Sequence, residues 1–127
     1  MPVEVLLVED NHSDVLLIKN IVAEFSLDVR ITVAKDTQTA VALLFDPGFS
    51  PRLVITDMHM PNGVEELFKR SEVKGIPVVV FSSALSPSEV AEVLKLGARE
   101  YVVKPVQWDE FRDAVVRIFR RWTAHPL

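Results

Sequence analysis

The chain has 127 residues, of which 49% are hydrophobic and 25% charged; this composition suits one compact globular domain and excludes a disordered chain. The net charge of −4 gives no electrostatic basis for nucleic-acid binding, and the absence of cysteine excludes disulfides and thiol chemistry. Without a basic secretory signal or an apolar stretch near the roughly 20 residues of a membrane helix, we expect a cytoplasmic protein with no membrane contact.

Short apolar runs that indicate strands alternate with helical patterns from one end of the chain to the other. Strands are expected over about residues 4–9, 29–34, 52–57, 77–82 and 100–104. Helices are expected over about residues 13–25, 40–44, 63–75, 86–97 and 107–122. The fourth helix has the clearest ends, because Ser86-Pro87-Ser88-Glu89 forms a capping box and Gly97 is a natural left-handed cap. Five βα units predict a doubly wound α/β fold, with one five-stranded parallel sheet covered by helices on both faces.

Four of the expected strands end at polar residues that can handle phosphate and Mg²⁺. These residues are Glu9-Asp10, Asp57, Ser82 and Lys104-Pro105. Open α/β sheets bind ligands just beyond the carboxyl ends of their strands, so three acids, a hydroxyl and an amine should converge there. Carboxylates together with a backbone carbonyl suit Mg²⁺. A carboxylate oxygen could attack phosphorus to form an aspartyl phosphate, while the amine and the hydroxyl bind phosphoryl oxygens.

Each of these residues also has a plainer explanation when it is taken alone. A lone aspartate is more often a helix cap, a lysine such as Lys104 is more often a solvated charge, and Ser82 could be a turn residue. The convergence of all of them favours a metal and phosphoryl site. Nucleotide binding is excluded, because the sequence has neither a Gly-rich loop ending in Gly-Lys-Ser/Thr nor a Gly-x-Gly-x-x-Gly motif.

Taken in order, these motifs resemble the receiver domain of two-component response regulators, the CheY-like family with a flavodoxin-like (βα)5 fold. The resemblance extends over essentially all of residues 1–127. Its motifs are an acidic pair, a phosphoacceptor aspartate followed two residues later by a metal-ligating carbonyl and Met-Pro, a Ser/Thr and a Lys-Pro. They match Glu9-Asp10, Asp57, His59, Met60-Pro61, Ser82 and Lys104-Pro105, and Gly97-Ala98 leads to Tyr101 as to the family's switch aromatic.

The resemblance implies that Asp57 accepts a phosphoryl group from a histidine kinase or phosphotransfer protein. Mg²⁺ would be bound by Asp10, Asp57 and the backbone carbonyl of His59, with Glu9 assisting through water. The protein would be a phosphoacceptor switch and not an enzyme, beyond catalysing its own phosphorylation and slow dephosphorylation.

The resemblance also implies how the signal leaves the site. Ser82 and Lys104 would be drawn toward the phosphoryl group, and Tyr101 would turn inward. The face formed by the fourth helix, fifth strand and fifth helix would then bind an unknown downstream protein. We expect a single receiver domain over 1–127 with no output domain, as a monomer or weak homodimer, and we expect Lys104→Ala to leave folding intact.

Two features depart from the family pattern and leave alternatives open. Only Asn62 separates Pro61 from Gly63, so this loop is about two residues short and the third helix should be short too. The His59 side chain is interpreted as solvent-facing; the alternative is that it obstructs or orients the water that hydrolyses the phosphoryl group. An aspartyl phosphatase of the haloacid-dehalogenase type would need an acid where His59 stands. A degenerate receiver that senses without phosphate is disfavoured by the intact Asp57.

Overall fold

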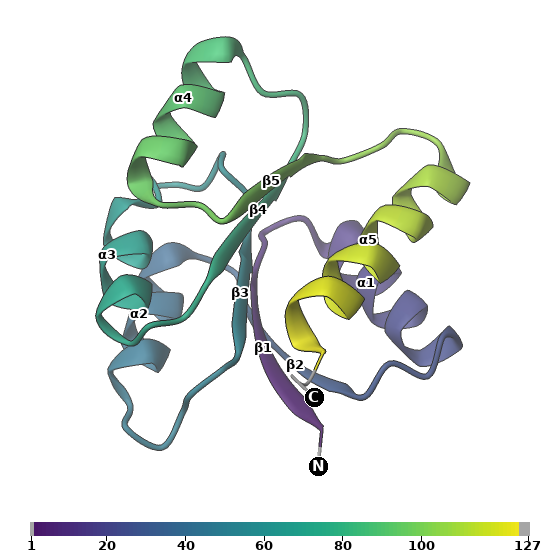
Figure 1. Ribbon diagram of the computed structural model, residues 1–127, viewed down its shortest axis with the longest axis horizontal. Coiled ribbons are helices and arrows are strands. Elements are labelled where there is room, and N and C mark those ends of the chain that lie inside the picture. Colours follow the sequence, from purple (N-terminus) through teal and green to yellow (C-terminus); the bar gives the residue numbers. More distant parts are fainter. Residues whose placement is uncertain (1, 125–127) are drawn as a thin grey trace.

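The computed structural model describes residues 2–124, which form one parallel sheet with five helices, as Figure 1 shows. The strands are β1 (Val3–Val8), β2 (Val29–Ala34), β3 (Leu53–Thr56), β4 (Val78–Ser82) and β5 (Glu100–Val103). The helices are α1 (His12–Glu24), α2 (Thr37–Phe45), α3 (Glu65–Val73), α4 (Pro87–Leu96) and α5 (Trp108–Thr123). The expected (βα)5 fold is confirmed, and every expected element is present.

The strand order β2-β1-β3-β4-β5 determines where a ligand can bind. The chain leaves β1 toward β2 on one side and then crosses to β3 on the other side. The order therefore reverses between β1 and β3, and the crevice beyond their carboxyl ends is the topological switch point at which such sheets bind ligands. Glu9-Asp10 and Asp57 follow these two strands directly.

The sheet separates two apolar layers, because successive side chains of a strand point to opposite faces. Val5 and Leu7 of β1 lie in the layer that packs against α1 and α5, whereas Leu6 and Val8 lie in the layer under α2, α3 and α4. Figure 1 shows the same division of the helices. All four side chains are at most 2% exposed, which explains why the buried strands are continuous apolar runs.

The caps of α4 are those predicted from the sequence, whereas the N-cap of α2 makes that helix longer than predicted. Ser86 accepts a hydrogen bond from the Glu89 amide and the Glu89 side chain accepts one from the Ser86 amide, which confirms the capping box. Gly97 has the left-handed φ of 103° expected of the C-cap. Helix α2 begins three residues earlier than expected, because the Asp36 side chain accepts a hydrogen bond of 2.7 Å from the Thr39 amide and caps it.

The short loop after β3 is closed by a tight turn. Asn62 and Gly63 both have positive φ angles, 67° and 75°, and the Gly63 amide donates to the Met60 carbonyl at 3.0 Å. The buried Thr37 hydroxyl donates to the Pro61 carbonyl at 3.4 Å and ties the loop to α2. Helix α3 has nine residues, so the expectation of a short third helix is confirmed.

No helix within residues 2–124 combines the length and apolar character needed to span a membrane.

Candidate functional site

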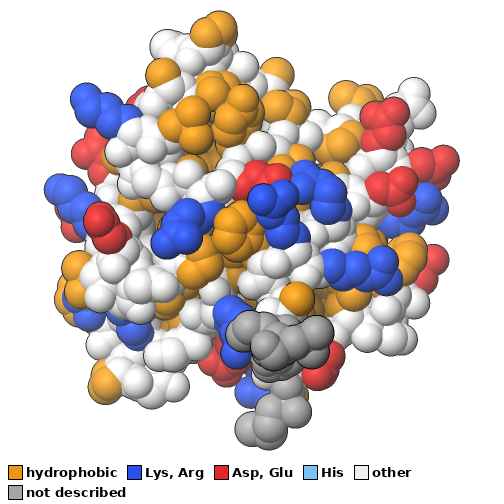
Figure 2. Space-filling view, in the orientation of Figure 1, with side chains coloured by type: hydrophobic (Ala, Val, Ile, Leu, Met, Phe, Trp, Pro, Cys, Tyr) orange, Lys and Arg blue, Asp and Glu red, His pale blue; other side chains and the backbone are white. Residues whose placement is uncertain are grey.

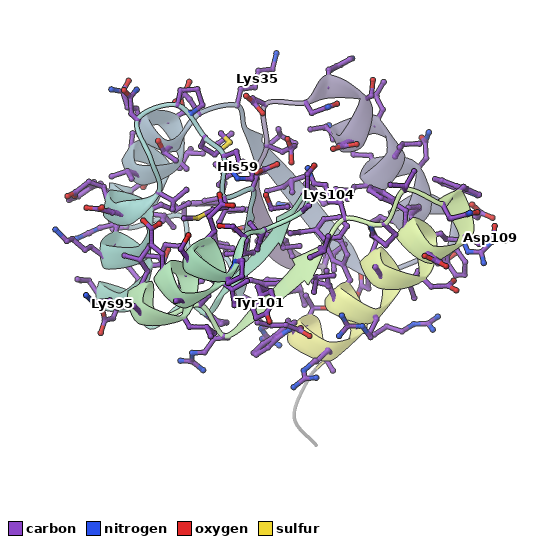
Figure 3. All side chains as sticks on the ribbon, turned by 90° about the horizontal axis from the view of Figure 1, so that it is seen from above. Lys35, His59, Lys95, Tyr101, Lys104 and Asp109 are labelled. Atoms are coloured by element: carbon purple, nitrogen blue, oxygen red, sulfur yellow. The ribbon has the colours of Figure 1, made fainter. Side chains whose placement is uncertain are left out.

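The predicted site residues meet at the carboxyl edge of the sheet, and Lys104 lies among them. Its Nζ is 2.7 Å from Glu9 Oε2 and 2.9 Å from Asp57 Oδ2. A third acid, Asp14, contacts the same nitrogen at 2.9 Å. Figure 3 looks onto this edge and shows Lys104 and His59 near its centre. The predicted convergence of Glu9, Asp57 and Lys104 is therefore present in the structure.

Both carboxylate oxygens of Asp57 accept hydrogen bonds. Oδ1 accepts from the His59 amide and from the Ser82 hydroxyl, each at 2.8 Å, and Oδ2 accepts from Lys104. Burial alone would raise the pKa of Asp57, but the His59 amide, Lys104 and Ser82 outweigh it and hold the pKa below its usual value. Asp57 is therefore an anion at neutral pH, as a nucleophile must be.

Glu9 is the deepest acid of the site, with a side chain only 3% exposed. Its Oε1 accepts from the Asn11 amide at 3.0 Å and its Oε2 accepts from Lys104. Burial nevertheless raises the pKa of Glu9 above its ordinary value, because these hydrogen bonds do not fully replace the lost water. Glu9 is therefore a buried carboxylate for which a further cation would be favourable.

The raised pKa of Glu9 predicts how its removal changes stability with pH. The native state binds a proton at Glu9 more tightly than the unfolded chain does, so the contribution of Glu9 to stability is full below about pH 4.5 and is lost as the pH rises through the folded pKa. Urea denaturation in EDTA should therefore show that Glu9→Gln becomes more stable relative to wild type between about pH 4 and pH 7. A relative loss of stability over this range would contradict the assignment.

The oxygen donors at this edge fit a divalent cation. Asp10 is exposed and follows β1 directly, next to the buried Glu9. Glu9, Asp14 and Asp57 share the single positive charge of Lys104, so negative charge is in excess here. Within residues 2–124 no three His, Cys, Asp or Glu side chains are placed to hold a metal on their own. The expected site also uses the carbonyl of His59, and its excess of hard oxygen donors and negative charge suits Mg²⁺.

The His59 side chain is exposed, as the favoured interpretation from the sequence expected, but it also makes contacts that the sequence did not predict. Its Nε2 lies 2.5 Å from Glu89 Oε2, and its Nδ1 lies 3.4 Å from the Ser82 hydroxyl. The capping box of α4 supplies this acceptor, because Glu89 is held at the start of the helix by Ser86. The ring, which is 49% exposed, therefore connects the first turn of α4 with the serine beside Asp57.

Sequence reasoning missed Asp14 and Glu100. Asp14 lies in the first turn of α1, which starts at the carboxyl edge, and this position was the signal that could have identified it. Glu100 on β5 accepts hydrogen bonds from Arg117 at 2.8 Å and from the Trp122 indole at 2.9 Å, and so it links β5 to α5. These two partners, together with the charge of Arg121, outweigh burial and lower the pKa of Glu100.

Tyr101 lies at the surface between α4 and α5, as Figure 3 shows, and is 39% exposed. Leu94 of α4 and Val103 of β5 are further exposed apolar side chains, with exposed fractions of 52% and 44%. Figure 2 shows hydrophobic side chains beside a band of Lys and Arg side chains where α4, β5 and α5 meet. The expected docking face therefore carries exposed apolar groups.

Comparison with known proteins places this geometry in a family. The model of the response regulator receiver domain matches residues 5–116. The chain belongs to this family. Asp57, Ser82 and Lys104 all lie within the matched residues, and receiver domains are signalling switches of two-component systems.

Relatives and solved structures of receiver domains agree with this assignment. The two-component response regulator ORR11 of Oryza sativa subsp. indica is 36% identical over 126 residues, which cover 94% of this chain and 80% of ORR11. The phosphorylated cyanobacterial phytochrome response regulator RcpA has a TM-score of 0.88 at 24% identity, covering 100% of this chain and 98% of RcpA. The Mn²⁺-bound form of the response regulator Rcp1 has a TM-score of 0.86 at 25% identity, covering 99% of this chain and 98% of Rcp1.

Proposed function

We propose that Asp57 is the phosphoacceptor of this receiver domain and takes its phosphoryl group from a histidine kinase or phosphotransfer protein. The observation that supports this most is the position of the Asp57 carboxylate, ionised and bound by Ser82 on one oxygen and by Lys104 on the other. In the transfer, an Asp57 oxygen forms a bond to phosphorus, the bond from phosphorus to the donor nitrogen breaks, and the donor imidazole keeps that electron pair.

A divalent ion completes the proposed site. Asp10, Asp57 and the His59 carbonyl would hold Mg²⁺, with Glu9 assisting through water. When bound, the ion would neutralise charge on the phosphoryl oxygens and on the carboxylates around it. The hard oxygen donors of the site support this proposal, and the structure of Rcp1 with Mn²⁺ is a precedent in a similar receiver.

Phosphorylation changes the charge that Ser82 and Lys104 face. The phosphoryl group adds roughly two negative charges and strong acceptor oxygens, so the hydroxyl and the ammonium turn from the Asp57 carboxylate to these oxygens. Tyr101, which lies on β5 beside β4, then turns inward and changes the surface of α4, β5 and α5. A downstream protein binds this altered surface.

The geometry of the site supports an aspartyl phosphatase less well than a phosphoacceptor switch. Such an enzyme needs an acid two residues after the nucleophile, whereas His59 stands there and directs its side chain to Glu89. We therefore propose that the only chemistry of the site is its own phosphorylation and slow dephosphorylation. A cytoplasmic location and a monomeric or weakly dimeric state stay predictions.

Intact-mass spectrometry tests the proposal without knowledge of the kinase. Incubation of the whole chain with acetyl phosphate and Mg²⁺ should add the mass of one phosphoryl group. The same incubation with EDTA should leave the mass unchanged, because the acid cluster then repels the donor. Equal labelling with Mg²⁺ and with EDTA would overturn the metal requirement, and no labelling in either would overturn the phosphoacceptor role.

A further inference from the structure

Lys104 has one more acidic partner than the proposed function uses. Its ammonium group has three hydrogens, and three carboxylates lie within hydrogen-bond distance of it: Glu9 at 2.7 Å, Asp57 at 2.9 Å and Asp14 at 2.9 Å. Glu9 and Asp57 belong to the proposed metal and phosphoryl site, whereas Asp14 has no role there. The contact between Asp14 and Lys104 therefore needs its own explanation.

Asp14 is fixed at the outer side of the Lys104 ammonium. Its backbone amide donates to the side chain of Asn11, the N-cap of α1, at 3.1 Å, and this bond fixes the start of the helix. The Asp14 side chain is 21% exposed, compared with 3% for Glu9 and 11% for Asp57. Asp14 is therefore the outermost of the three acids that contact Lys104.

Competition for the carboxylates gives Asp14 a role. Lys104 occupies Oδ2 of Asp57 and Oε2 of Glu9, which are oxygens that the proposed metal site draws on. Before Asp57 and Glu9 can turn toward a divalent ion, Lys104 has to weaken its bonds to them. The Lys104 side chain is only 8% exposed, so an ammonium group left there without acceptors would be strongly unfavourable. Asp14 is the acceptor that it keeps.

We infer that Asp14 is a positioning residue: it retains the Lys104 ammonium while Glu9 and Asp57 turn to the metal ion, and so it favours Mg²⁺ binding. This inference rests on the proposed function. Without the charge of Asp14, Lys104 is attracted only by carboxylates of the metal site and competes more strongly for them. Loss of Asp14 therefore weakens Mg²⁺ binding through Lys104.

Calorimetric titration with Mg²⁺ alone, without a phosphodonor, tests this inference. Asp14→Asn removes the charge and keeps the shape of the side chain. Asp36→Asn is the matched control: Asp36 follows β2 at the same edge and caps α2, asparagine caps equally well, and the change leaves the contacts of Lys104 intact. We expect Asp14→Asn to raise the Mg²⁺ dissociation constant about fivefold. Asp36→Asn should change it less than about twofold, because solvent and salt screen its charge.

The Lys104→Met variant tests whether Asp14 affects Mg²⁺ binding through Lys104. There, Asp14→Asn should change the Mg²⁺ dissociation constant less than about twofold. Circular dichroism establishes that each variant is folded; if Lys104→Met is not, Asp14→Glu takes its place and should bind Mg²⁺ like wild type.

Three results would overturn the inference: equal effects of Asp14→Asn and Asp36→Asn, an undiminished effect in the Lys104→Met background, or an Asp14→Glu variant as weak as Asp14→Asn. Failure of the wild-type chain to bind Mg²⁺ would instead overturn the proposed function, and the inference with it.

Discussion

Asp57→Asn should abolish phosphoryl labelling by acetyl phosphate in the presence of Mg²⁺. Asparagine has nearly the same shape, so it can keep the hydrogen bond from Ser82. Its amide is neutral, however, and lacks the carboxylate oxygen that attacks phosphorus. The expected loss is complete, not partial, because among the residues that the structure describes only the Asp57 carboxylate accepts hydrogen bonds from both a serine hydroxyl and a lysine ammonium group. Intact-mass spectrometry measures it directly.

Asp109→Asn is the matched control for this experiment. Asp109 lies in the first turn of α5 with a side chain 78% exposed, and it pairs only with Arg112 of its own helix among the described residues. The control should be labelled like wild type. Labelling that persists in Asp57→Asn would show that another residue is the acceptor.

Lys104→Ala should destabilise the fold when Mg²⁺ is absent. The substitution removes the cation that contacts Glu9, Asp14 and Asp57, and Glu9 and Asp57 are almost completely buried. Breaking a buried ion pair by removing one partner is strongly destabilising, so we expect the free energy of unfolding in EDTA to fall by about 3 kcal/mol. The sequence alone had suggested that Lys104→Ala leaves folding intact, because it showed neither how deeply the lysine is buried nor its contact with Asp14.

Urea denaturation with EDTA and with Mg²⁺ measures this effect. Mg²⁺ should restore part of the lost stability, because a ligand that binds only the native state stabilises it by mass action. Lys69→Ala is the control: Lys69 is 72% exposed and pairs on the surface with Glu66, so its loss should change stability by less than about 0.5 kcal/mol. Equal stability of Lys104→Ala and wild type in EDTA would mean that the acid cluster does not depend on this lysine.

Much of the site followed from the sequence because strand topology is a strong constraint. Glu9, Asp57, Ser82 and Lys104 each follow an apolar run directly. Once those runs form parallel strands of one sheet, their carboxyl ends meet at one edge. A site that uses all four side chains could therefore be predicted before any distance was known. The structure places the Asp57 carboxylate within 2.9 Å of both Ser82 and Lys104.

The contacts that sequence reasoning missed all depend on side-chain direction across elements. Asp14 lies on a helix, and the packing of α1 beside α5 on one face of the sheet brings it to Lys104, 90 residues away in the chain. The contact between the exposed His59 side chain and Glu89 was missed because no pattern shows that residues 30 positions apart meet. Periodicity locates an element and its buried face, but it does not determine which polar groups of separate elements meet.

The location of the phosphoryl group within the labelled chain tests the central claim most directly. After incubation with acetyl phosphate and Mg²⁺, borohydride reduction converts an aspartyl phosphate to homoserine, and peptide mass spectrometry identifies the modified position. We predict homoserine at position 57 and unmodified aspartate at positions 10 and 14. Homoserine at position 10 or 14, or a labelled chain with Asp57 unchanged, would contradict the account.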